Sequence, residues 1–267
     1  MGTTLRATHR FRKSTNMSLP ILNLAAYQFS PVAEPEVTRR TLGEVGRDLG
    51  IKGTILVTPE GLNAFLAGEE EPCRKMLACL RQVPGFEAMP AKESWSVRVP
   101  FMRFKVKVKK EIIRMDHPTI RPADQRAPAI DSQTLERWLD QGHDDAGNAV
   151  VMLDTRNGFE VDVGKFENAL DLRIQKFTEF PGAVQKHREA LGGKTVVSYC
   201  TGGIRCEKAA LYMHELGLTN VYQLDGGILK YFEETDARHW QGECFVFDAR
   251  TALSGDLTPR AQDAVAP

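Results

Sequence analysis

Residues 196–208 read VVSYCTGGIRCEK, and this stretch decides the fold of the C-terminal half of the chain. The run 195–199 is β-branched and apolar, which predicts a buried strand, and two glycines then mark a short loop. Residues 207–216 have the pattern of a helix that Gly217 ends. In open sheets of parallel strands, ligands bind beyond the carboxyl ends of the strands. The stretch therefore predicts a functional loop that begins at Cys200.

This loop has the composition of an anion-binding site with a reactive cysteine. Backbone N–H groups of such a loop, together with the N-terminus of the next helix, form a concavity that stabilises negative charge. We therefore expect the thiolate of Cys200 to be stabilised and its pKa to be low. The alternative is that Cys200 is a small buried core residue, which the glycine-rich context disfavours. The predicted loop consists of Cys200, Thr201, Gly202, Gly203, Ile204 and Arg205.

The rest of the C-terminal half alternates between strand and helix patterns. Such alternation is typical of a doubly wound α/β fold with a parallel sheet. The predicted strands are 150–154, 169–172, 195–199 and 221–224, and the predicted helices are 134–141, 180–191, 207–216 and 228–234.

The N-terminal half predicts a different architecture. Its order of strand and helix patterns is βαββαβ, which is typical of a ferredoxin-like α+β sandwich. The predicted strands are 21–29, 53–57, 62–66 and one long extended stretch, 95–113, and the predicted helices are 36–49 and 71–82.

Composition divides the chain into two domains. Residues 116–133 hold three prolines and few large apolar residues, which predicts a linker on the surface between domains 19–115 and 134–241. Residues 1–18 are expected to be a disordered extension, and 242–267 a C-terminal segment. The formal net charge is zero, so a polyanion would need a local basic patch.

The five cysteines indicate a reducing compartment, which we expect to be the cytoplasm. Their number is odd, and the basic N-terminus lacks the apolar stretch of a secretion signal. A membrane span would need about 20 consecutive apolar residues, and the sequence has none. The sequence also shows no cluster of thiolates and histidines at the spacing that zinc requires, so we predict no metal site.

The stretch 196–208 resembles the active loop of the rhodanese family, in which the cysteine carries a persulfide. Four residues separate Cys200 from Arg205; tyrosine-phosphatase-like enzymes have five. The sequence LDTR at 153–156 is similar to the family's first strand and turn, and DGG at 225–227 to its last strand-to-helix turn. For Asp154 and Arg156 we favour a role in stabilising the fold over a role in catalysis.

A narrower resemblance is to the tRNA uridine-34 hydroxylase family. It is carried by GTILV at 53–57, EGLN at 60–63 and WQGECFVFD at 240–248, in combination with the cysteine loop. The resemblance implies that molecular oxygen is a co-substrate, that the wobble uridine becomes 5-hydroxyuridine, and that Cys200 is the active residue, acting through a persulfide. It implies no firmly bound cofactor. With Cys244 as the sole cysteine of the C-terminal segment, a metal site there is not expected.

A basic stretch at 98–114 is the candidate contact for the anticodon stem-loop of a tRNA. Arg103, Lys105, Lys107 and Lys109 alternate with Met102, Phe104, Val106 and Val108, so a strand would place the cations on one face and the apolar residues on the other. Phosphates along an RNA strand could pair with such a row. The other interpretation is an edge strand that lysines protect from aggregation.

Two neighbours of the loop are possible auxiliary residues. Cys206 could resolve a persulfide or could pack under the loop, and Lys208 could add to a basic rim. Phe245 and Phe247 are expected to pack the C-terminal segment onto the fold, with base stacking as the second interpretation.

Two rival functions use the same loop or the same fold. A plain sulfurtransferase would move sulfane sulfur from a donor protein or small thiol through Cys200, but it would not need the N-terminal domain. A non-catalytic docking module would not need the nucleophile.

Overall fold

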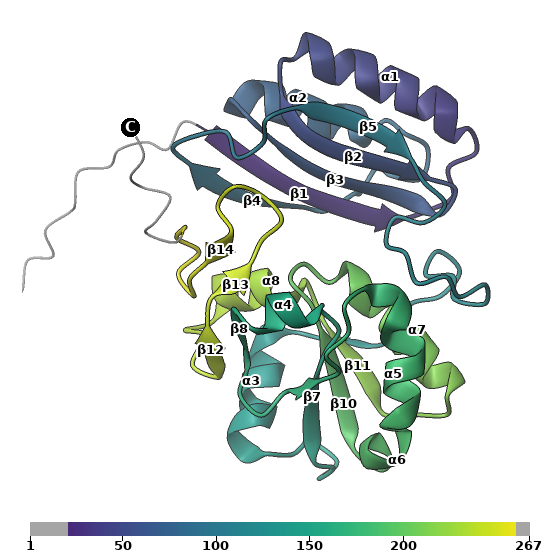
Figure 1. Cartoon of the computed structure of the whole chain (residues 1–267), viewed down its shortest axis with the longest axis vertical. Helices are drawn as coiled ribbons and strands as arrows, with labels where there is room; N and C mark the ends of the chain where they lie inside the picture. Colours follow the sequence, from purple (N-terminus) through teal and green to yellow (C-terminus); the bar gives the residue numbers. More distant parts are fainter. Residues whose placement is uncertain (1–20, 260–267) are drawn as a thin grey trace, which may run out of the picture.

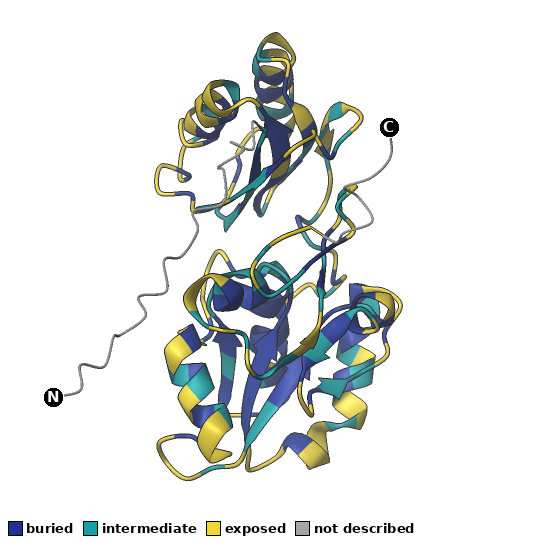
Figure 2. Cartoon of the chain, turned by 90° about the vertical axis from the view of Figure 1, so that its left-hand side faces the viewer, coloured by how far each residue is buried: buried dark blue, intermediate teal, exposed yellow. Residues whose placement is uncertain are grey.

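The computed structural model describes residues 21–259, so the predicted extension at 1–18 lies outside the described residues. The chain forms two sheet-containing domains, one above the other in Figure 1. Coloured by burial, both sheets are lined by buried residues, while the exposed residues gather on the outer sides of the helices and on the loops (Figure 2). Within these residues, no helix is both long and apolar enough to cross a membrane.

The N-terminal domain is the predicted α+β sandwich with an additional strand. Its five-stranded sheet has the order β4-β1-β3-β2-β5. The elements are β1 (Ile21–Phe29), α1 (Pro35–Asp48), β2 (Lys52–Thr58), β3 (Gly61–Gly68), α2 (Glu70–Leu80), β4 (Ala91–Ser96) and β5 (Phe104–Val108).

The prediction of one extended stretch over 95–113 is wrong. The chain forms two strands at opposite edges of the sheet: β4 pairs antiparallel with β1, and β5 pairs parallel with β2. Pro100 lies in the connection between them. It has no N–H to give to a ladder, so continuous pairing through this point is disfavoured.

Helices α1 and α2 cover one face of the N-terminal sheet. Leu22, Leu24 and Ala26 of β1 are buried in the core beneath them. Helix α1 lies so close to β5 that a Cβ on Gly46 would stand 2.2 Å from the ring of Phe104, so a larger residue there would have to displace that ring. The other face of the sheet carries no helix (Figure 1).

We call the helix-free side the open sheet face. Laterally paired residues point to the same side of a sheet, and Ala25 pairs with Phe65 and with Lys92. Thr54 pairs with both Phe65 and Lys105, and Leu56 pairs with Lys107. The open sheet face therefore carries Tyr27, Phe65, Lys92, Lys105 and Lys107.

The C-terminal domain is the predicted doubly wound fold. Its main sheet has the order β6-β11-β10-β7-β9, and every pair in it is parallel. The strands are β6 (Ala129–Ile130), β7 (Val150–Asp154), β9 (Leu170–Asp171), β10 (Thr195–Tyr199) and β11 (Val221–Leu224). The helices are α3 (Ser132–Gln141), α4 (Gly158–Val161), η1 (Phe177–Glu179), α5 (Phe180–Lys186), α6 (Arg188–Leu191), α7 (Ile204–Glu215) and α8 (Gly227–Glu234).

Two predictions in this half are corrected. The predicted linker 116–133 is not a free connection, because β6 joins the sheet beside β11 and Ile120 and Ala127 are buried in the domain core. These few apolar residues suffice to hold the segment against the fold. The predicted helix 180–191 is two helices that meet at His187, which has φ −103° and ψ 5°.

The C-terminal segment adds short strand pairs to the C-terminal domain and contacts the N-terminal domain. β12 (Trp240–Gly242) pairs with β8 (Gly164–Phe166), and β13 (Cys244–Phe245) pairs with β14 (Ala252–Leu253). The segment also reaches the N-terminal domain, where the Arg250 Nη1 group donates to Ser94 Oγ at 2.8 Å. Residues 242–259 therefore contact both domains.

Candidate active site

Cys200 lies where the sequence predicts it, directly after the central strand β10 and before α7. The backbone N–H of Gly203 donates to its sulfur at 3.1 Å. Gly203 has φ 101°, a conformation that favours glycine. A Cβ on Gly227 would stand 2.4 Å from the carbonyl oxygen of Cys200, so the turn after β11 packs directly against the loop.

The loop favours the charged form of the sulfur. Burial opposes ionisation of the Cys200 thiol, but a hydrogen bond from Cys206, the charge of Arg205 and backbone N–H groups outweigh it and lower the pKa to about 5. Burial, and then the neighbouring Cys200, raise the pKa of Cys206 well above its ordinary value. Both effects favour Cys200, rather than Cys206, as the sulfur that carries the negative charge.

The other cysteines show the opposite behaviour. Burial raises the pKa of Cys73 to about 11 and that of Cys244 to about 12. Burial also raises the pKa of Cys79. Of the five cysteines, all of which are free thiols within the described residues, Cys200 alone has a lowered pKa. The chemistry of a thiolate is thus confined to one position in the chain.

Arg205 is held in place by a carboxylate that the sequence analysis did not find. Its guanidinium donates to both carboxylate oxygens of Glu160 on α4, at 2.6 and 2.7 Å, and both side chains are buried. A bidentate pair fixes the plane of the guanidinium. The two residues are 45 positions apart in the chain, and no spacing pattern links them.

Asp154 and Arg156 form a buried ion pair at the carboxyl end of β7. Arg156 is fully buried, and its guanidinium forms an ion pair with Asp154. The guanidinium also donates to the carbonyl oxygen of Gly164 at 2.7 Å, and it packs over the rings of Tyr199 and Trp240. Neither residue contacts Cys200 by a hydrogen bond that the structure shows. Their surroundings fit the predicted stabilising role.

The sulfur of Cys200 lies in the predicted loop, but it is buried there rather than open to solvent. Cys200 is 1% exposed, and the N-terminal domain contacts the residues that follow it in the loop. The hydroxyl of Tyr27 occupies the space beside Gly203, where a Cβ would be 2.8 Å from it, and the Lys92 ammonium donates to the Gly202 carbonyl at 3.4 Å. Gly202 itself borders open space, since a Cβ there would meet nothing within 4 Å.

Lys208 does not form a basic rim. It is 1% exposed, and its ammonium bonds to Glu60 at 2.9 Å and to Glu111 at 2.6 Å. Both carboxylates precede the C-terminal domain in the chain, so Lys208 joins the two halves rather than extending a cationic surface. Cys206, by contrast, is buried beneath the loop with its sulfur 3.8 Å from Thr155 Oγ1, which fits the packing interpretation.

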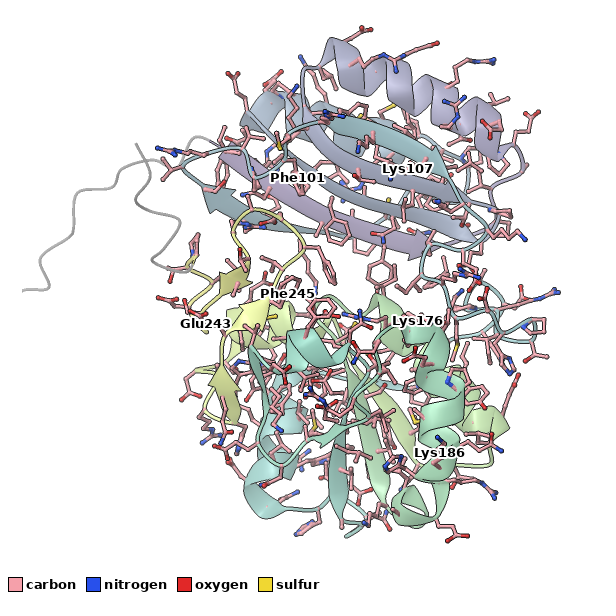
Figure 3. All side chains as sticks on the ribbon, viewed as in Figure 1. Phe101, Lys107, Lys176, Lys186, Glu243 and Phe245 are labelled. Carbon is pink, nitrogen blue, oxygen red and sulfur yellow. The ribbon has the colours of Figure 1, made fainter. Side chains whose placement is uncertain are left out.

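Replacement of Lys208 by methionine is expected to weaken the contact between the domains. It leaves two carboxylates without their shared cation, at a cost of about 1–3 kcal/mol in the free energy of unfolding. Urea denaturation measures this loss. Lys186 on α5 is the matched control, because it is exposed and far from the N-terminal domain (Figure 3), and equal losses from Lys186→Met would contradict the expectation.

The basic row lies on an edge strand. Lys105 and Lys107 are exposed on the open sheet face, and Figure 3 shows Lys107 on the N-terminal sheet. Arg103 and Lys109 are exposed next to the ends of β5. Phe104, Val106 and Val108 pack against the core as predicted, but Met102 does not share their face: it is 92% exposed. It precedes β5, where strand alternation does not yet apply.

Two further features adjoin the loop. Three phenylalanines pack edge to face, with ring centroids of Phe245 5.2 Å from Phe159 and 5.1 Å from Phe247, and the backbone carbonyl of Phe245 accepts from Thr201 Oγ1 at 3.5 Å. Phe245 lies where the C-terminal segment passes between the two sheets (Figure 3). A pocket of about 380 Å³ is lined by Ile113, Arg114, Asp116, Asn157, Lys176, Phe177, Thr178 and Arg205.

Comparison with known proteins assigns the chain to a family. Residues 21–112 match the UPF0176 acylphosphatase-like domain, and residues 128–234 match the rhodanese-like domain. A tRNA uridine(34) hydroxylase of Variovorax paradoxus is 58% identical over 246 residues, which cover 92% of this chain and 94% of that protein. This chain belongs to the tRNA uridine(34) hydroxylase family. A family member from Delftia acidovorans is 57% identical over 243 residues, covering 90% of this chain and 92% of that protein.

Solved structures resemble the two halves separately. A rhodanese-like domain from Anabaena is 19% identical, with a TM-score of 0.35, and the match covers 43% of this chain and 80% of that one. An acylphosphatase from Coxiella burnetii is 12% identical, with a TM-score of 0.25, and the match covers 33% of this chain and 92% of that one.

Proposed function

We propose that this protein hydroxylates uridine 34 of tRNA to 5-hydroxyuridine, with Cys200 as the active cysteine and molecular oxygen as co-substrate. The observation that carries the proposal is the buried sulfur of Cys200, which accepts from the Gly203 N–H at 3.1 Å and whose pKa is lowered by Cys206, Arg205 and loop N–H groups. A thiolate is the nucleophile that accepts a sulfane sulfur and becomes a persulfide. The names of the relatives supply the substrate.

A reaction at the Cys200 loop requires an unpaired base. A side chain or backbone group can reach the C5 edge of a uracil only where the base is unstacked, as in an anticodon loop. Gly202 is half-buried, and a Cβ there would meet nothing within 4 Å, so this part of the loop borders open space. We therefore place the entry of the base at the Gly202 side of the loop.

The open sheet face is the proposed path of the RNA backbone. Its Tyr27 and Lys92 contact the Cys200 loop, while Lys105 and Lys107 extend the same face to the opposite edge. Side chains two residues apart on the same strand, such as Lys105 and Lys107, lie about 7 Å from each other, which is near the spacing of phosphates along an RNA strand. Arg103 and Lys109 prolong the row at either end.

Charge reversal at Lys105 and Lys107 is expected to weaken tRNA binding and to reduce its salt dependence. Each lost phosphate contact lowers the slope of affinity against salt by roughly one unit. Binding of tRNA measured at several salt concentrations tests this for Lys105→Glu with Lys107→Glu. Unchanged affinity and slope would show that the lysines only protect an edge strand. Lys186→Glu is the matched charge control, since that exposed lysine lies on the other domain's outer helix.

The alternative function is a sulfurtransferase that passes sulfane sulfur from a donor protein or small thiol to an acceptor. It needs the same thiolate, and the loop geometry supports it equally. The N-terminal domain favours the hydroxylase, because it places Tyr27 and Lys92 over the loop and Lys105 and Lys107 on the same face. A docking module without catalysis is disfavoured by the ionised sulfur. We place the reaction in the cytoplasm, where its tRNA substrate is found.

Nucleoside analysis of tRNA tests the proposal. The gene is deleted, total tRNA is digested, and its nucleosides are measured by mass spectrometry before and after complementation. Nucleosides derived from 5-hydroxyuridine are expected to disappear and to return with the wild-type gene. If they persist in the deletion strain and purified protein forms none on its tRNA in the presence of oxygen, the hydroxylase proposal fails. Transfer of sulfane sulfur to a thiol by the same protein would then support the alternative.

A further inference from the structure

Lys92 stands out among the lysines of the N-terminal domain. It lies on edge strand β4, paired with Ala25 of β1, and therefore on the open sheet face. Its ammonium is directed at the other domain and donates to the carbonyl oxygen of Gly202, two residues after Cys200, at 3.4 Å. In the described part of the chain, no carboxylate lies within 4.0 Å of it to form an ion pair. A half-buried cation without a close counter-ion is energetically unfavourable unless another negative charge stabilises it.

We infer that Lys92 is a positioning residue of the active site, contributed by the N-terminal domain, which fixes the loop at Gly202 and stabilises the anionic sulfur of Cys200. The inference rests on the proposed function for its purpose, but it concerns a contact and a charge that are measurable without hydroxylation.

The electrostatics of Lys92 agree with this role. Burial lowers the pKa of Lys92, and the negative charge of Cys200 is the largest influence that raises it again, ahead of Glu233 and Asp225. Coupling between two charges is reciprocal, so a sulfur that favours the ammonium form is itself favoured in its thiolate form. Lys230 acts in the opposite direction on Lys92 and is itself bound to Asp225 at 2.5 Å.

The other groups around the Cys200 sulfur are one cation, Arg205, and two neutral side chains. Arg205 lowers the pKa of Cys200 by its charge, and two short hydrogen bonds pair its guanidinium with Glu160. Cys206 is a neutral thiol, and the Tyr27 hydroxyl is kept neutral because burial raises its pKa well above the ordinary value. Lys92 is the cation that approaches the loop from the side of the N-terminal domain.

This arrangement gives the N-terminal domain a direct part in the chemistry. A rhodanese-type loop alone has the cation of Arg205 and the amides of the loop. Here the second domain adds an ammonium on the side where Gly202 borders open space and where we place the entry of the base. When the domains are in contact, the reactive centre is complete.

The test compares Lys92→Met with Lys92→Arg, and with Lys52→Met, which removes an exposed lysine of the same sheet. The ultraviolet absorbance of the Cys200 thiolate is titrated in each variant, with the same variant carrying Cys200→Ser as the reference for the other four cysteines. Lys92→Met is expected to raise the midpoint of the titration by about a few tenths of a pH unit, since Lys92 is one of several groups that act on the sulfur. Lys92→Arg is expected to restore most of the shift, and Lys52→Met to leave the midpoint unchanged.

Two outcomes would overturn the inference. One is an unchanged midpoint in Lys92→Met; the other is an equal rise in Lys52→Met. A folded-state check by near-ultraviolet circular dichroism accompanies each variant, and if Lys92→Met is unfolded, Lys92→Gln decides by the same criterion. If the wild-type protein makes no 5-hydroxyuridine but the Lys92 variants shift the titration as described, the proposed function fails while the role of Lys92 stands.

Discussion

Replacement of Cys200 by serine is expected to reduce formation of 5-hydroxyuridine by about a thousandfold or more, because residues that act as the reacting group contribute effects of this size. A serine hydroxyl does not ionise at neutral pH in this loop and cannot hold a sulfane sulfur. The rate is measured with purified protein on tRNA from the deletion strain. Substrate binding is expected to stay within about threefold of wild type.

Cys79→Ser is the matched control for this loss. Cys79 lies on α2 of the N-terminal domain, is half-buried, and has a pKa that burial raises. We expect its replacement to leave the rate unchanged. A Cys200→Ser protein that still hydroxylates its tRNA at the wild-type rate would remove the cysteine from the mechanism altogether.

Replacement of Asp154 by asparagine is expected to give a large loss of stability. Asp154 and Arg156 are both completely buried, and the carboxylate accepts from the Arg156 guanidinium at 2.6 and 2.9 Å. Removing one partner of a buried ion pair leaves an uncompensated charge, at a cost of about 3–5 kcal/mol in the free energy of unfolding. Urea denaturation at neutral pH measures this change.

An exposed pair of the same type provides the control. Arg137 on α3 pairs with Asp145 at the surface, where solvent screens the interaction. Asp145→Asn is expected to leave the free energy of unfolding essentially unchanged. If both asparagine variants unfold at the same urea concentration, the buried pair does not stabilise the fold as argued.

The sequence predicts the elements well where local patterns decide them. Strand β10 at Thr195–Tyr199, strand β11 at Val221–Leu224 and the cysteine loop between β10 and α7 lie where the alternation of strand and helix patterns places them. The resemblance to the tRNA uridine(34) hydroxylase family is confirmed by the relatives. These features depend on short stretches of chain, each of which carries its own signal.

The sequence misses what depends on pairing across long distances. The split of 95–113 into β4 and β5 follows from pairing with β1 on one edge and β2 on the other, which no local pattern reveals. Glu160 reaches Arg205, and Lys92 reaches Gly202, through tertiary packing alone. The contact of Lys208 with Glu60 likewise follows from the docking of the N-terminal domain against the C-terminal domain.

The proposed chemistry depends most on the ionisation of Cys200, which nuclear magnetic resonance measures residue by residue. Protein labelled with ¹³C at the cysteine Cβ is titrated with acid and base, and the Cys200 signal is assigned by its absence from Cys200→Ser. We predict that its chemical shift changes with a midpoint near pH 5, where the sulfur loses its proton. A midpoint at or above about 8.5, the ordinary value of a free cysteine, would contradict the account.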